Sequence, residues 1–300
     1  MTAAAYRCSV ASETSNEPLL GTASTIRDWL LVEHPGPWGA HALRDARLPD
    51  GLGRFLRRRE RTLGIRVLLI RRPGRRPVGG RSWCFALHTG PERPWIERTH
   101  LLDVREVMDL DLDPLGRGDS IGLTSHEAPL FCVCTHGRRD PCCAERGRPL
   151  ALALSGMFPD ETWESTHIGG DRFAGNLIAF PHGFYLGRIE PDHAAGIAAA
   201  YAGGRIDLQH MRGRSCRPMD VQAAEQYLRE ARDLRGVDDV GTHEVVRSET
   251  ETEATFWTSV GVVRVRVRRG RGPLAQLTCH SEIGEHPPAY QLVGIDGGTW

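Results

Sequence analysis

Short apolar runs separated by turn residues dominate the pattern of this chain. In the first third, the runs at 29–33 and 65–70 predict buried strands, and turns rich in proline and glycine follow both. Residues 50–62 carry apolar positions at helical spacing, and 82–89 and 95–102 predict two more strands with a short turn between them. This alternation of strands and helices predicts α/β structure.

The same order of elements returns after the acidic, turn-rich stretch 109–120. A strand, a helix, a second strand and a hairpin follow, at 129–133, 144–157, 161–166 and 176–189. Two alanine-rich amphipathic helices come next, at 192–202 and 219–234. Strand, loop, helix, strand, hairpin and helix is the order of a thioredoxin-like module. Because both halves show it, two tandem thioredoxin-like domains are the alternative to a single one.

We therefore predict an α/β chain in three parts. An N-terminal α/β domain covers 1–118 and would be a degenerate thioredoxin-like domain in the tandem alternative; a thioredoxin-like domain covers 119–238, and a β-rich C-terminal extension covers 239–300. In that extension, 254–268 alternate valine with arginine, which predicts an edge strand. Cys84 and Cys279 lie in apolar stretches and are predicted to be small core residues of strands.

The composition is that of a soluble globular protein, with 40% hydrophobic and 25% charged residues among 300. The net charge is zero and there is no lysine, so all 38 basic residues are arginines. Arginine enrichment can indicate phosphate or nucleic-acid binding, but the codon usage of a GC-rich genome explains it as well, and we expect no nucleic-acid partner. No run of eighteen apolar residues and no signal peptide is visible, which predicts a cytoplasmic protein without a membrane partner.

The candidate chemistry lies in the cysteines, four of which fall within the twelve residues 132–143. In a cytosolic protein, clustered cysteines more often indicate metal or redox chemistry than structural disulfides. Cys134 and Cys143 stand at the two ends of a loop that contains glycine and proline, so they can converge on one centre. His167 follows 24 residues after Cys143, and Asp171 lies four positions further, past two glycines that allow a sharp turn.

Two thiolates, an imidazole and a carboxylate make a plausible four-ligand site. Thiolates select zinc, copper(I) and iron–sulfur clusters, and structural zinc favours cysteine pairs with two to four residues between them. A wide first pair followed by a short second pair fits two separately ligated irons better. From the residues alone, an iron–sulfur cluster, a zinc site and a dithiol redox centre remain open.

Three motifs in this order resemble the sucrase/ferredoxin-like family, which is grouped with the thioredoxin-like 2Fe–2S ferredoxins. They are CTHGRRDPCC, HIGGDRFAGN and FPHGFYLGRI, and the N-terminal pieces CSVAS, GTAS and LLVEHPGPWG are similar to that family too. The resemblance implies a 2Fe–2S cluster held by a Cys-x8-Cys pair and a His-x3-His pair. By position these fall on Cys134, Cys143 and His167, whereas Asp171 stands where the pattern has its second histidine.

The resemblance implies an electron-transfer protein, in which 119–238 is the ferredoxin domain and unidentified redox proteins are the partners. The fourth ligand is predicted to be Asp171, with Cys142 or Cys132 as substitutes. A thiol–disulfide oxidoreductase is an alternative, weakened by the lack of a Cys-x-x-Cys that opens a helix. A structural zinc-binding module is the other alternative. No pair of catalytic carboxylates supports sucrase activity, so we expect an electron carrier more than a catalyst.

Overall fold

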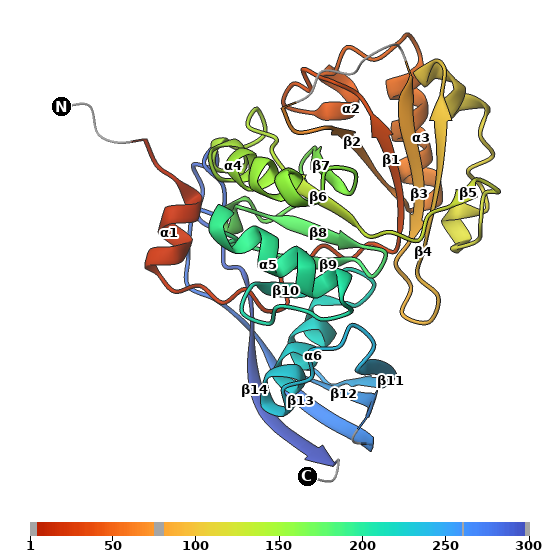
Figure 1. Cartoon of the computed structure of the whole chain (residues 1–300). Coiled ribbons are helices and arrows are strands. Elements are labelled where there is room, and N and C mark those ends of the chain that lie inside the picture. Colours follow the sequence, from red (N-terminus) through yellow and green to blue (C-terminus); the bar gives the residue numbers. More distant parts are fainter. Residues whose placement is uncertain (1–4, 75–80, 260, 298–300) are drawn as a thin grey trace.

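The fold is mixed α/β with two separate sheets, as the computed structural model shows for residues 5–74, 81–259 and 261–297 (Figure 1). The first half contains α1 (Cys8–Thr14), β1 (Asp28–Glu33), α2 (Ala42–Asp45), α3 (Leu52–Leu63), β2 (Arg66–Arg71), β3 (Ser82–His88), β4 (Trp95–Leu101), the 3-10 helices η1 (Val104–Asp109) and η2 (Leu115–Arg117), and β5 (Thr124–Ser125).

The second half repeats this alternation and then ends in strands. It contains β6 (Leu130–Cys134), α4 (Pro141–Met157), β7 (Thr162–Ser165), η3 (Asp171–Phe173), β8 (Leu177–Phe180), β9 (Phe184–Leu186), α5 (Pro191–Ala202), β10 (Met211–Arg214), α6 (Met219–Arg232), β11 (Val240–Arg247), β12 (Glu251–Thr258), β13 (Gly261–Arg271) and β14 (Pro288–Gly297). The strands and helices predicted up to residue 234 are present, with ends shifted by up to three residues. Sequence patterning did not predict the helices α1 and α2, the 3-10 helices, or the strands β5 and β10.

One pattern of strand pairing occurs twice in the large sheet. In the first half, β1 is parallel to β2 and antiparallel to β3, which pairs with β4. In the second half, β6 is parallel to β7 and antiparallel to β8, which pairs with β9. An antiparallel contact between β2 and β7 joins the two sets. The result is one ten-stranded sheet in the order β10-β9-β8-β6-β7-β2-β1-β3-β4-β5.

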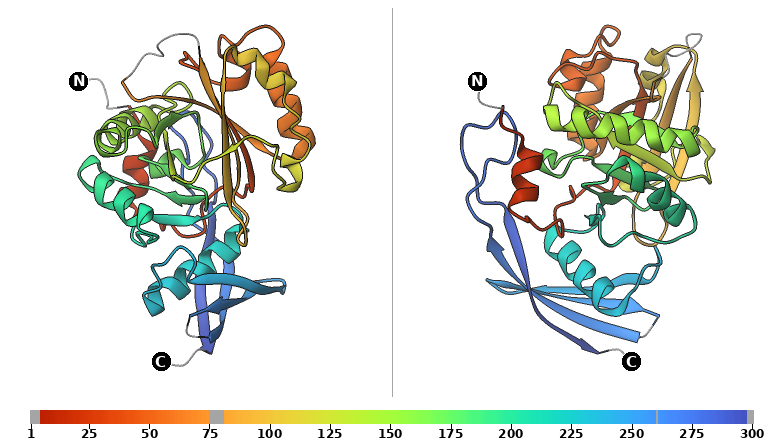
Figure 2. Two further views of the ribbon diagram at one scale, coloured as in Figure 1. Left: turned by 45° about the vertical axis from the view of Figure 1, so that its right-hand side comes forward. Right: turned by 60° about the vertical axis from the view of Figure 1, so that its left-hand side comes forward.

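The large sheet curls, so that strands from both halves bury one shared core. Trp29 of β1 meets Phe180 of β8 with ring centroids 5.3 Å apart, and Phe85 of β3 meets Trp163 of β7 at 5.6 Å. On the outer faces, α3 packs on the first half and α4 and α5 pack on the second (Figure 2). The carboxyl end of β6 and the loop after β7 therefore lie near the junction of the two halves.

The C-terminal strands form the second sheet, in the order β11-β12-β13-β14, with α6 packed on one face. The prediction of an edge strand over 254–268 is wrong: this segment spans β12 and β13, and β13 lies between β12 and β14. The alternation of valine and arginine arises because Val263, Val265 and Val267 face α6 while the arginines face solvent.

The two cysteines that were predicted to lie in the core differ in environment. Cys84 is buried in β3 among apolar side chains, as predicted. Cys279 is not in a strand: it lies in a turn between β13 and β14 and is partly exposed. The three-domain division at 118 and 238 stays a prediction. Within the described ranges, the helices are too short or too polar to cross a lipid bilayer.

Candidate metal centre

The first two candidate ligands are brought together by the packing of α4 on β6. Cys134 is the last residue of β6, and Cys143 lies in the first turn of α4. Asp140 caps that helix, because its Oδ1 accepts a hydrogen bond of 2.9 Å from the backbone N–H of Cys142. One turn further, Gly147 lies so close to β6 that a Cβ there would meet the carbonyl oxygen of Cys134 at 2.0 Å. The missing side chain thus lets the helix start lie directly against the strand end.

The other two candidate ligands lie on the loop that follows β7. Gly169 and Gly170 have φ values of +97° and +76°, which reverse the chain between His167 and the 3-10 turn that starts at Asp171. Asn176 holds this turn through a hydrogen bond of 2.7 Å from its Nδ2 to the carbonyl of Gly170.

A buried arginine far along the chain holds the same loop. Arg212 of β10 is 1% exposed and donates to the carbonyl of Gly169 at 3.1 Å and to Oδ1 of Asn176 at 2.9 Å. It also donates to the carbonyl of Thr22 at 2.6 Å, which ties the loop to the segment before β1. Sequence reasoning missed Arg212, and the short Arg-Gly-Arg context around it contains no signal that would have pointed to this role.

The donor atoms of Cys134, Cys143 and His167 all lie within 4.8 Å of one another. Asp171 joins them: its Oδ1 accepts a hydrogen bond of 3.0 Å from Sγ of Cys143 and lies 2.9 Å from Nδ1 of His167. Both cysteines are 1% exposed and Asp171 is 4% exposed, whereas the side chain of His167 is 24% exposed. We call these four residues the Cys134 site.

Neighbouring groups in the Cys134 site stabilise the charged forms of Cys134, His167 and Asp171. A hydrogen bond with Cys143 lowers the pKa of Cys134 well below its ordinary value and raises that of Cys143. Burial works against a charged His167, but the carboxylate of Asp171 and the sulfur of Cys134 outweigh it and raise its pKa to about 9. Burial likewise opposes ionisation of Asp171, yet His167 keeps the pKa of this carboxyl below its ordinary value.

The donor set of the Cys134 site fits a thiophilic metal centre. Nδ1 of His167 is buried, and its contact with Asp171 lacks hydrogen-bond geometry, so this nitrogen has no hydrogen-bond partner among the described residues. A buried polar atom without a partner is costly, and a metal ligand bond would satisfy it. Thiolate and imidazole donors suit zinc or iron, and carboxylate oxygen is an accepted additional ligand for both.

The family model described as sucrase/ferredoxin-like matches residues 19–213, about two thirds of the chain. The chain belongs to the sucrase/ferredoxin-like family. This confirms the resemblance stated from the three motifs, and all four residues of the Cys134 site lie inside the matched region.

A relative of this family member is the altered inheritance of mitochondria protein 32 of Meyerozyma guilliermondii. The two are 32% identical over 78 residues, which are 23% of this chain and 28% of the relative. The match thus spans less than a third of the relative's length. No solved structure matches the chain significantly.

The structure separates the substitute ligands from the Cys134 site of this family member. Cys132 lies on the same face of β6 as Cys134, among apolar side chains of the shared core, but it is not one of the residues whose donor atoms lie within 4.8 Å of one another, and burial raises the pKa of its thiol. Cys142 precedes Cys143 on α4, but its Sγ lies 3.7 Å from Sγ of Cys8, in a different group of side chains. Side chains at adjacent helical positions point about 100° apart, so the neighbouring residues Cys142 and Cys143 direct their sulfur atoms into different groups of side chains. The donor nearest to the fourth position is therefore the carboxylate of Asp171.

His136 joins the Cys134 site to the first half of the chain. Its Nε2 donates to the carbonyl of Gly39 at 2.7 Å, and its Nδ1 accepts from the backbone N–H of His167 at 3.2 Å. Burial lowers the pKa of His136, which favours the neutral ring that both hydrogen bonds require. His136 thus positions the backbone of His167 and does not bind sulfur.

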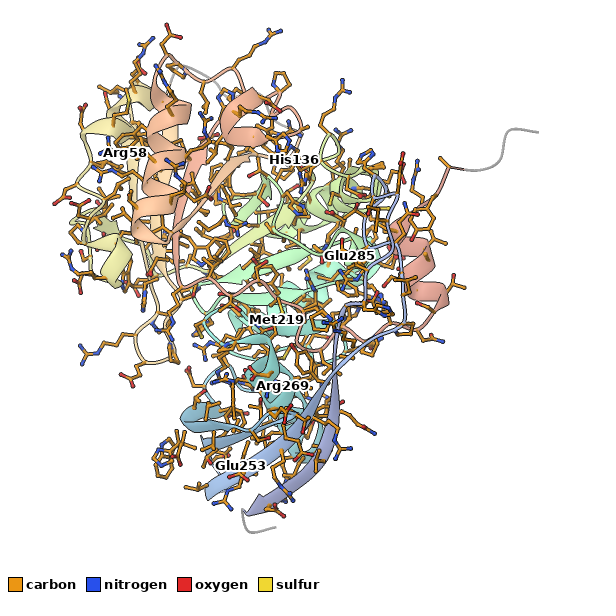
Figure 3. All side chains as sticks on the ribbon, turned by 180° about the vertical axis from the view of Figure 1, so that it is seen from behind. Arg58, His136, Met219, Glu253, Arg269 and Glu285 are labelled. Atoms are coloured by element: carbon orange, nitrogen blue, oxygen red, sulfur yellow. The ribbon has the colours of Figure 1, made fainter. Side chains whose placement is uncertain are left out.

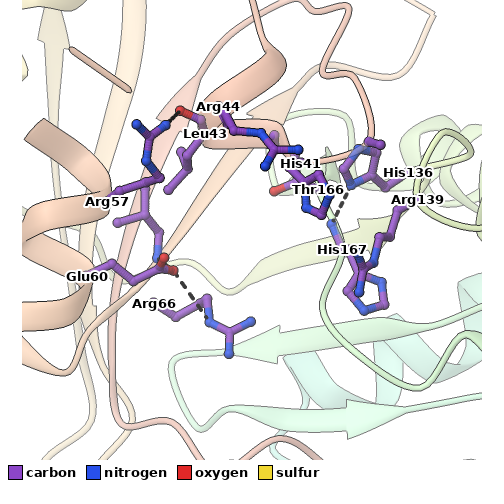
Figure 4. Close-up of a pocket in the computed structure, with 13 residues that line it drawn as sticks. His41, Leu43, Arg44, Arg57, Glu60, Arg66, His136, Arg139, Thr166 and His167 are labelled. Atoms are coloured by element: carbon purple, nitrogen blue, oxygen red, sulfur yellow. Dashed lines mark hydrogen bonds and ion pairs between the residues drawn. The ribbon is translucent and has the colours of Figure 1, made fainter. Parts of the chain in front are cut away.

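A cleft of about 400 Å3 opens beside His167, between the two halves (Figure 4). His136, Arg139, Thr166 and His167 line one wall. The opposite wall comes from α2, α3 and β2 and carries His41, Arg44, Arg57, Glu60 and Arg66. The partly exposed imidazole of His167 therefore faces a predominantly basic opening.

Proposed function

We propose that this chain is a 2Fe–2S electron-transfer protein of the thioredoxin-like ferredoxin type. The observation that carries the proposal is the convergence of two cysteines, one histidine and one aspartate at a single buried point, in a member of a family described as ferredoxin-like. Cys134 and Cys143 would be the thiolate ligands, His167 the imidazole ligand and Asp171 the fourth ligand. A bound 2Fe–2S cluster would supply one-electron redox chemistry.

The residues of the chain have separate tasks in this proposal. Cys134 and Cys143 are almost fully buried, so they would keep water from the sulfur side of the site. His167 is the donor that retains exposure, and it would form the route to a partner through the basic cleft. His136 and Arg212 would hold the two loops at the required separation.

The repeated strand pairing supports the thioredoxin-like part of the proposal. A strand that is parallel to the strand after its helix and antiparallel to the first strand of a hairpin is the core of a thioredoxin-like domain, and it occurs in both halves. We infer two tandem domains of this type, of which the second carries the ligands. The first supplies one wall of the cleft.

The basic cleft supports a redox partner with an acidic surface. Arg44 and Arg139 are exposed at its rim, so a complementary acidic patch could dock close to His167. A cytoplasmic location agrees with eight cysteines, all among the described residues, that form no disulfide.

A structural zinc ion in the Cys134 site is the second candidate. The close spacing of its donors, all within 4.8 Å, suits one tetrahedral ion. A thiol–disulfide oxidoreductase is disfavoured, because a substrate disulfide would have to reach sulfur atoms that are 1% exposed.

The experiment that tests the proposal is metal and spectroscopic analysis of the full chain purified anaerobically. We expect a brown protein with about two irons and two acid-labile sulfides per chain, and an EPR signal after reduction. Cys134→Ser should abolish all three. Cys132→Ala is the matched control, because Cys132 lies two residues away on the same face of the strand but outside the group of donor atoms.

Asp171→Ala should reduce the iron content, whereas Asp171→His should retain the cluster and raise its reduction potential. The potential should rise because a neutral imidazole replaces an anionic ligand. A colourless protein whose only metal is zinc, lost on Cys134→Ser, would establish the zinc candidate and refute electron transfer.

A further inference from the structure

Three thiols from widely separated parts of the chain meet on the other side of the start of α4. Sγ of Cys142 lies 3.7 Å from Sγ of Cys8 and 3.4 Å from Sγ of Cys279, and the last two sulfurs are 3.6 Å apart. Cys8 and Cys142 are 1% exposed. In Figures 2 and 3 the loop that follows β13 and carries Glu285 runs beside α1, which brings Cys279 to Cys8.

The spacing of these sulfurs is that of ligands on one tetrahedral ion. A zinc–sulfur bond of about 2.3 Å gives sulfur–sulfur edges of about 3.8 Å in a regular tetrahedron. A disulfide joins two sulfurs at about 2.05 Å and would leave the third unpaired. In a multi-iron cluster, thiolates bound to different irons lie farther apart. Three mutual contacts of 3.4–3.7 Å therefore favour a single ion.

Asp140 completes the group. Its side chain is fully buried, and both carboxylate oxygens lie 3.8 Å from Sγ of Cys8. One oxygen accepts from the N–H of Cys142 at 2.9 Å and the other from the N–H of Cys279 at 2.7 Å, which orients two of the three cysteines. Each oxygen keeps a lone pair that can bind a metal.

The donor set identifies the metal. Three thiolates select soft or borderline ions, and a carboxylate disfavours copper(I), so zinc is the ion that accepts both kinds of ligand. Cys142 also lies at the amino end of the long helix α4, where the helix dipole favours the thiolate form.

We propose that Cys8, Cys142, Cys279 and Asp140 bind a structural zinc ion, which we call the three-thiol site. The ion fastens α1 and the loop between β13 and β14 to the start of α4. This inference goes beyond the proposed function, because it concerns different residues and a different metal. The neighbours Cys142 and Cys143 would serve one site each, so the zinc would also fix the helix end that carries a ligand of the Cys134 site.

The experiment is zinc and iron analysis of the full chain, in parallel with four variants. We expect about one zinc per chain in the wild type and a loss of about tenfold or more in Cys8→Ser and in Cys279→Ser. Cys216→Ser is the matched control, since Cys216 is a buried turn cysteine outside both sites, and it should keep the zinc. Cys134→Ser should lose iron and keep zinc.

A measurement on the wild type tests the same proposal if one of the variants does not fold. The native protein is treated with N-ethylmaleimide with and without a zinc chelator, and the labelled peptides are mapped by mass spectrometry. Cys8 and Cys279 should be labelled only after chelation. The proposal is overturned by a zinc-free wild type, by zinc that follows Cys134→Ser alone, or by a disulfide among the three cysteines. A zinc-free wild type or a disulfide among the three cysteines leaves the iron test of the Cys134 site unchanged. Zinc that is lost only in Cys134→Ser would instead place the zinc in the Cys134 site.

Discussion

At the residue scale, the chain uses neutral histidines to connect buried backbone. His136 links the Cys134 site to Gly39, and His182 shares a hydrogen bond of 2.7 Å with the hydroxyl of Tyr201 at the turn between β8 and β9. Neither ring is predicted to bind metal. Such a ring resists protonation when it is buried, which makes it a source of acid sensitivity.

His182 should make the fold less stable at low pH. Burial, and secondarily Arg214, lower its pKa to about 4, with Asp238 acting in the opposite direction. The unfolded chain binds the proton near pH 6.5 and the folded chain only near pH 4. The free energy of unfolding should therefore fall by roughly 3 kcal/mol as the pH drops through this interval.

Urea denaturation of the wild type and of His182→Gln at pH 7, 6, 5 and 4 measures this effect. The difference in the free energy of unfolding between the two proteins should shrink as the pH falls. Only the wild type has a buried imidazole whose low pKa destabilises the folded state in acid. His286→Gln, at an exposed position, is the control. A constant difference across the range would contradict the assignment.

At the scale of the element, α4 is the platform that brings ligands to both proposed sites. Its first turn carries Cys142 and Cys143, and its N-cap is Asp140. One turn later, the absence of a side chain at Gly147 lets the helix pack directly against β6. These features follow from a capping residue, a proline in the first turn and a glycine at one contact, all visible in the sequence.

Gly147→Ala should displace α4 from β6. The added Cβ would lie 2.0 Å from the carbonyl oxygen of Cys134, a contact with backbone that cannot rotate away. We expect a loss of about 1–3 kcal/mol in the free energy of unfolding, together with a loss of iron. Thermal denaturation and iron analysis measure the two effects.

Gly156→Ala is the matched control for this substitution on the same helix. A Cβ at Gly156 meets no described atom within 4 Å, so the change should be neutral or stabilise by about 0.5 kcal/mol. Equal effects of the two substitutions would show that helix propensity, and not the contact with β6, decides the outcome.

At the scale of the whole molecule, a short strand contact joins the two halves. Only two residue pairs form the register between β2 and β7, and one of them is Arg71 opposite Glu164. Nε of Arg71 donates to Glu164 at 2.7 Å, Thr135 donates to the same carboxylate at 3.0 Å, and Arg71 lies over the ring of Trp38. This network connects β6, β7, β2 and the loop after β1.

Glu164→Gln should weaken the junction, because Arg71 would keep its charge in a largely buried position. We expect a cost of about 2 kcal/mol, less than the 3–5 kcal/mol of a fully buried pair, since Arg71 retains 26% exposure. Asp119→Asn, in an ion pair whose partners are 65% and 64% exposed, is the control and should change stability by less than about 0.5 kcal/mol. Equal effects in chemical denaturation would contradict a special role of the junction.

The sequence by itself determined the local elements and the composition of the Cys134 site. Strand and helix periodicity depends on residues close to one another, so most elements up to residue 234 could be predicted. Cys134, Cys143, His167 and Asp171 lie within 38 residues, in two motifs whose glycines and proline indicate loops, and they meet in the structure.

Only the tertiary structure decided which distant segments meet. The pairing of β2 with β7 joins residues 93 or more positions apart, and Arg212 reaches the His167 loop across 36 or more positions. Cys279 and Cys8, which also meet, are 271 positions apart. The alternation of valine and arginine likewise indicates that one face of the strand is buried. It does not indicate whether the strand lies at the edge of the sheet or between two other strands. Such contacts depend on how whole elements pack. The apolar face of a single segment can be buried by any apolar surface, so its own sequence does not specify which distant element covers it.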